Sequence, residues 1–111
     1  MQPDLATMIK RLGALRARVE GGEEAPLAQI EEALTDGYAE ALAADAWSMS
    51  TEDRLQELIT NASIPVRGRE LRALATEHQC FQRDLIALRR ELAALRRDRD
   101  GRRAHSSVRS V

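Results

Sequence analysis

The sequence predicts an all-α protein, built as a long antiparallel helical hairpin with coiled-coil packing, a shorter N-terminal helix and a disordered C-terminal tail. Apolar residues recur at alternating spacings of three and four along most of the 111 residues, which is the period of packed helices. The strongest interruptions are a double glycine at 21–22 and the segment 61–65, which ends in proline. Tyr38, Trp47 and Phe81 are the only aromatic residues, and so few large rings favour elongated helices over a broad core.

The first helix is expected at about 5–20. Asp4 follows a proline, and its carboxylate can accept hydrogen bonds from the free backbone N–H groups of a first turn. The double glycine ends the helix, because glycine adopts the left-handed conformation without a steric cost. The apolar stripe of this segment consists of Leu5, Met8, Leu12, Leu15 and Val19, with Ile9 beside it.

The second helix is expected at about 27–60, after Pro26, whose missing N–H costs nothing in a first turn. A rival interpretation ends this helix near Trp47 and starts another with Ser50 as its cap. The heptad pattern of apolar residues that begins at residue 27 resumes in the same register at residue 55. This favours one continuous helix but leaves the interpretation with two helices open. We call the positions of a helix that face its partner helix the seam. Between residues 34 and 55 the seam residues of the second helix are all small: Gly37, Ala41, Ala44, Ser48 and Thr51.

The third helix is expected at about 66–99, because Pro65 ends the link and can precede a helix. Beyond Arg99 the sequence is polar and aperiodic, so 101–111 is predicted to be a disordered basic tail and 1–100 a single helical domain. The heptad pattern of the third helix is uninterrupted from residue 71 to residue 95. Its seam residues are Leu71, Leu74, His78, Phe81, Leu85, Leu88, Leu92 and Leu95.

The short link at 61–65 favours folding the third helix back along the second as an antiparallel hairpin. A pivot there places Gly37 opposite Leu92, so that the small residues of one helix meet the large residues of the other. The alternative is a parallel dimer through the third helix, in which Glu91 would pair with Arg96 of a second copy. Both arrangements, and a dimer of hairpins, stay open at this point.

The second helix also carries apolar residues off its seam, among them Tyr38 and Leu42. The first helix, folding back across the double glycine, is expected to cover this side as far as about Leu42. Trp47 and Met49 lie past its end, and together with Ile86 they are predicted to form an exposed partner-binding patch.

Charge is segregated along the chain, although the net charge is only −1. Residues 1–22 carry a net charge of +2, residues 23–62 carry −9 and residues 63–111 carry +6, which favours folding one block onto another or onto a second copy. The basic end also supports an alternative function, the binding of nucleic-acid phosphates without sequence reading. Its candidate residues are Arg96, Arg97, Arg99, Arg102 and Arg103.

No catalytic, metal-binding or cofactor-binding site is expected. His78 and Cys80 are two positions apart and only His105 could join them, whereas a structural metal site needs at least three converging ligands. The sequence also contains no glycine-rich phosphate loop. The single cysteine and the absence of any stretch of roughly 20 apolar residues predict a cytoplasmic protein without a membrane span.

The segment LTDGYAEAL at 34–42 resembles a segment of small uncharacterised bacterial helical proteins. The resemblance covers nine of the 111 residues and implies no function. The sequence therefore predicts a non-catalytic coiled-coil interaction or adaptor protein, which acts through self-association or by binding a helix of a protein partner. The alternative is a nucleic-acid accessory protein, and neither a membrane nor a small-molecule substrate is expected.

Overall fold

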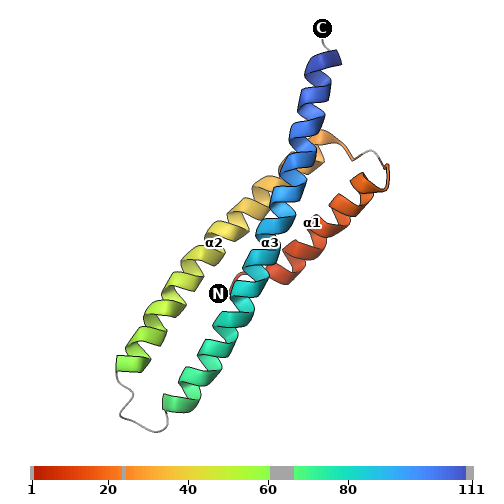
Figure 1. The fold of residues 1–111 in the computed structure, drawn as a ribbon. Helices are drawn as coiled ribbons and strands as arrows, with labels where there is room; N and C mark the ends of the chain where they lie inside the picture. Colours follow the sequence, from red (N-terminus) through yellow and green to blue (C-terminus); the bar gives the residue numbers. More distant parts are fainter. Residues whose placement is uncertain (1, 24, 61–66, 110–111) are drawn as a thin grey trace.

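The computed structural model describes residues 2–23, 25–60 and 67–109, with side chains in the last range given for 68–104, and this part of the chain is helical without strands. Its helices are α1 (Leu5–Glu20), α2 (Leu27–Thr60) and α3 (Arg67–Arg109). The molecule is elongated, 69 × 23 × 18 Å, with α2 and α3 antiparallel and α1 alongside, mainly against α3 (Figure 1). The predicted hairpin with a shorter N-terminal helix is confirmed, whereas the predicted link at 61–65 lies outside the described residues.

The seam between α2 and α3 follows the predicted register. A Cβ atom placed on Gly37 would lie 2.5 Å from Leu92 Cδ2, so these two residues face each other as the spacing predicts. α2 is continuous from Leu27 to Thr60, and the rival interpretation with a break near Trp47 is wrong. The α3 residues that a parallel zipper would use are buried within one chain: Phe81, Leu85, Leu88, Leu92 and Leu95.

α1 covers one flank of this seam and is held there by ion pairs. Arg11 contacts Asp36 at 2.8 Å, and Arg16 contacts Glu91 at 2.7 Å. Hydrogen bonds to Glu91 and then to Glu20 raise the pKa of Arg16, so that its guanidinium stays charged. Asp36 of α2 and Glu91 of α3 each directly precede a seam position, 37 and 92. α1 therefore covers the flank on which the residues that precede seam positions lie.

The prediction that α1 covers Tyr38 and Leu42 is wrong, because the side chain of Leu42 is 71% exposed and Tyr38 is 39% exposed. A residue that directly follows a seam residue lies about 100° around the helix from it, and a residue that directly precedes it lies about 100° the other way. Tyr38 and Leu42 follow Gly37 and Ala41, so they point away from the flank that α1 occupies.

α3 does not end near Arg99, as predicted, but continues to Arg109. The expectation of disorder from residue 101 onward therefore differs from the structure over 101–109. Two long-range contacts explain the difference: Arg102 donates a hydrogen bond to the carbonyl oxygen of Ala25, and the guanidinium of Arg103 pairs with Glu31. Contacts between residues so far apart in sequence are invisible to a pattern of local hydrophobicity.

The N-terminus of α1 is capped as predicted by Asp4. Its Oδ1 accepts a hydrogen bond from the backbone N–H of Thr7 at 3.1 Å, and its Oδ2 accepts one from the Thr7 hydroxyl at 2.6 Å. These bonds, the side-chain bond first, hold the pKa of Asp4 below its ordinary value of 3.8. The cap thus depends on the ionised carboxylate.

Asp4→Asn is expected to make the thermal stability of the chain less sensitive to acid. A carboxyl group with a lowered folded pKa stabilises the fold fully above its unfolded pKa, and loses that contribution as the pH falls through the folded value. The window therefore lies below pH 3.8. Asparagine caps helices about as well as aspartate but does not titrate. Thermal unfolding midpoints of both proteins at a series of acidic pH values test this, and parallel curves would contradict it.

Candidate functional site

Exposed hydrophobic side chains gather on the flank of the hairpin that α1 leaves uncovered. Among the side chains that the structure describes, the large hydrophobic ones that stay exposed are between 39% and 71% accessible. Each of them directly follows a seam position, 37, 41, 48, 58 or 85, and so lies on the side opposite α1. We call these residues the open flank: Tyr38, Leu42, Met49, Ile59 and Ile86.

A groove of about 710 Å³ lies between α2 and α3 on this side. Its rim is charged: the guanidinium of Arg89 pairs with Asp45 across the groove, and Arg96 lies 4.0 Å from Asp100. An apolar floor with a polar rim is the arrangement with which helical proteins bind an amphipathic helix. The groove is lined by Tyr38, Ala41, Leu42, Asp45, Arg89, Leu92, Ala93, Arg96, Arg97 and Asp100.

The structure divides the predicted patch of Trp47, Met49 and Ile86. Met49 and Ile86 belong to the open flank, at 66% and 51% exposure. Trp47 is half-buried on the other side of the seam, with its ring centroid 4.3 Å from that of Phe81 and the two ring planes tilted by 50°. Trp47 precedes the seam residue Ser48 and Met49 follows it, which separates the two side chains around the helix.

Sequence reasoning missed Tyr38, Leu42 and Ile59 as members of the open flank. The signal was present in the heptad frame, because all three follow a seam position directly. It could not be used without knowing which flank α1 would cover.

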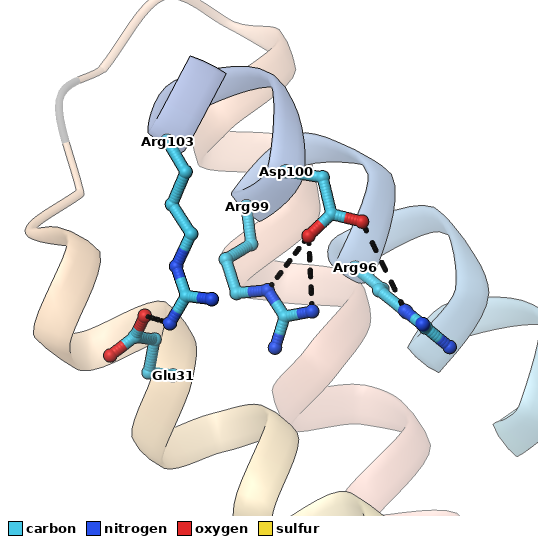
Figure 2. A network of polar contacts seen from close by, with 5 residues as sticks. All are labelled: Glu31, Arg96, Arg99, Asp100 and Arg103. Atoms are coloured by element: carbon cyan, nitrogen blue, oxygen red, sulfur yellow. Dashed lines mark hydrogen bonds and ion pairs between the residues drawn. The ribbon is translucent and has the colours of Figure 1, made fainter. Parts of the chain in front are cut away.

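The arginine-rich end of α3 is engaged in contacts within the chain (Figure 2). Asp100 accepts from Arg99 at 3.0 Å and lies near Arg96, and Arg103 reaches across to Glu31 of α2. Arg102 is bound to the backbone at Ala25. Of the five arginines predicted for phosphate binding, Arg97 alone has no hydrogen bond or ion pair with another described residue. A phosphate would have to compete with the acceptors already in place.

A polar cluster interrupts the apolar seam at Ser48. His78 Nε2 lies 3.2 Å from Ser48 Oγ and 3.6 Å from Glu52 Oε1, and the side-chain amide of Gln82 donates to Ser48 Oγ at 2.5 Å. In a serine–histidine–acid relay the two ring nitrogens contact the serine and the acid separately, whereas here Nε2 faces both. The cluster satisfies the hydroxyl of the buried Ser48 and does not form the geometry of an activated nucleophile.

No group of three or more His, Cys, Asp or Glu side chains that could hold a metal ion occurs among the described residues. Within the same part of the chain, no helix combines the length and the apolar character needed to cross a membrane. No protein-family model matches this chain, and neither does any curated protein or solved structure.

Proposed function

We propose that this chain is a non-catalytic, cytoplasmic interaction protein, which acts by binding a helix of another protein or of a second copy through its open flank. The observation that carries the proposal is the position of the exposed hydrophobic residues. They form one stripe along one side of the hairpin and are not scattered over its surface. Contiguous apolar surface of this kind is typical of interaction sites.

The architecture supports the same proposal. α1 already packs its own apolar stripe against one flank of the hairpin, so the fold contains an example of the contact that the open flank is proposed to make. On the open flank, the groove between α2 and α3 is a similar binding site for a helix.

Phosphate binding by the arginine-rich end has less support. Four of its five candidate arginines are bound to Asp100, Glu31 or the backbone at Ala25. Exposed ion pairs are weak, so they do not forbid phosphate binding, but they lower the positive charge that a phosphate would meet.

Affinity capture from the source cell, with the tagged chain as bait, tests the proposed function. We expect one protein to be captured in near-stoichiometric yield and its capture to survive nuclease treatment. That protein can be an untagged copy of the same chain. Leu42→Asp should abolish the capture, because it places a charge on the most exposed residue of the open flank, beside the groove. The side chain is 71% exposed, so the fold should tolerate this change.

Ala14→Asp is the matched control, because Ala14 is exposed on α1 and remote from the open flank. It adds the same charge and should leave the capture intact. A partner that survives Leu42→Asp, or that disappears on nuclease treatment, would contradict the proposed use of the open flank.

A further inference from the structure

We infer that the partner of the open flank is a second copy of this chain, bound flank to flank in a dimer whose twofold axis runs parallel to the hairpin. The inference rests on the proposed function and deepens it by naming the partner. Three properties of the hairpin support this dimer: the size of the open flank, the sign of the charges that would meet, and the levels at which side chains lie along the hairpin.

The open flank approaches the size of a standard stable dimer interface. The stripe from Tyr38 to Ile59 covers 22 residues of α2, or about 32 Å at the rise of an α-helix. Two packed helices present a face about 20 Å wide, so the flank offers about 600 Å² before surface relief is counted. A standard stable interface buries roughly 800 Å² on each partner.

The segregated charge selects the orientation of the two copies. A twofold axis parallel to the hairpin places α2 of one copy against α3 of the other, whereas an axis perpendicular to it places α2 against α2 and α3 against α3. Residues 23–62 carry a net charge of −9 and residues 63–111 carry +6. The parallel axis therefore brings opposite charges together, and the perpendicular axis brings like charges together.

The parallel axis also matches side chains by level. Because Gly37 lies opposite Leu92 and the two helices run antiparallel, Leu42 lies at the level of residue 87, next to Ile86. A parallel twofold axis preserves these levels. The most exposed apolar residue of α2 then meets the one large exposed apolar residue among the described side chains of α3.

The flank covered by α1 lies on the far side of the hairpin, so α1 does not obstruct the contact between the two copies.

Sedimentation equilibrium of the full chain over a micromolar range tests the dimer. We expect a reversible dimer, a dissociation constant raised by at least about tenfold in Leu42→Asp, and no change in Ala14→Asp. Circular dichroism checks that the variants keep their helicity. A monomer at every concentration would overturn self-pairing, while capture of a different protein through the open flank would leave the proposed function standing. A dimer that Leu42→Asp does not weaken would overturn the assignment of the flank.

Cysteine cross-linking tests the orientation. In a Cys80→Ser background, one chain carries Leu42→Cys and another carries Ile86→Cys, and the two are mixed under mild oxidation. The parallel axis predicts that mixed 42–86 dimers form faster than 42–42 or 86–86 dimers. Faster formation of the 42–42 or 86–86 product would overturn the parallel arrangement even if the chain dimerises.

Discussion

Replacing Gly37 with leucine is expected to lower the free energy of unfolding by about 1–3 kcal/mol, since the new side chain must enter a layer that is already full. A Cβ at this position would lie 2.5 Å from Leu92 Cδ2 of α3 and 3.3 Å from Leu12 Cδ1 of α1, so the interface between the helices has no room for a larger group. The gain in helix propensity over glycine, about 1 kcal/mol, offsets only part of this cost. Denaturant unfolding at one fixed protein concentration measures the change.

The partner of Gly37 can be identified by a double-mutant cycle with Leu92→Ala, which alone is expected to cost about 2–5 kcal/mol because Leu92 is buried. In the double variant the leucine at 37 can fill the space left at 92, so the combined loss should be well below the sum of the two. The matched control is Leu85→Ala, which removes an equally buried leucine two layers away. Additive losses at 37 and 92 would contradict the register of the seam.

Leu88→Ala is expected to be among the most damaging truncations in the chain, with a loss of about 3 kcal/mol in the free energy of unfolding. Leu88 is completely buried in the middle of the hairpin. For a domain with a total stability of about 5–15 kcal/mol, this loss is a large fraction.

Leu74→Ala is the matched comparison, because it makes the same truncation in the same seam of α3 but at a half-buried position near the tip of the hairpin. There the smaller buried area predicts a loss of about 1 kcal/mol. Equal losses at 74 and 88 would show that the tip is as well packed as the middle, against the burial pattern. Thermal or denaturant unfolding of both variants distinguishes the two cases.

The periodicity of the chain predicted the three helices except for the end of α3, and it favoured a continuous α2 and the observed register of the seam. The reason is that these features follow from local geometry: the 3.6-residue period fixes which residues share a face, and the small residues of α2 match the large residues of α3 in volume. The pairing of Gly37 with Leu92 was therefore predictable before any contact was seen.

The flank of the hairpin that α1 covers could not be predicted from the sequence. α2 carries apolar side chains on both sides of its seam, with Trp47 on one and Leu42 and Met49 on the other, and the heptad frame treats both sides alike. The choice is fixed by contacts such as that of Arg16 with Glu91, which are 75 residues apart. The open flank, which is the candidate site, is the side of the hairpin that α1 leaves uncovered.

The same reason explains the end of α3. Its sequence after Arg99 lacks the period of a packed helix, yet the helix continues to Arg109. Arg102 and Arg103 find Ala25 and Glu31, which are 77 and 72 residues away. Periodicity reports what a segment can bury along its own length, whereas contacts between distant segments depend on where the chain has placed them.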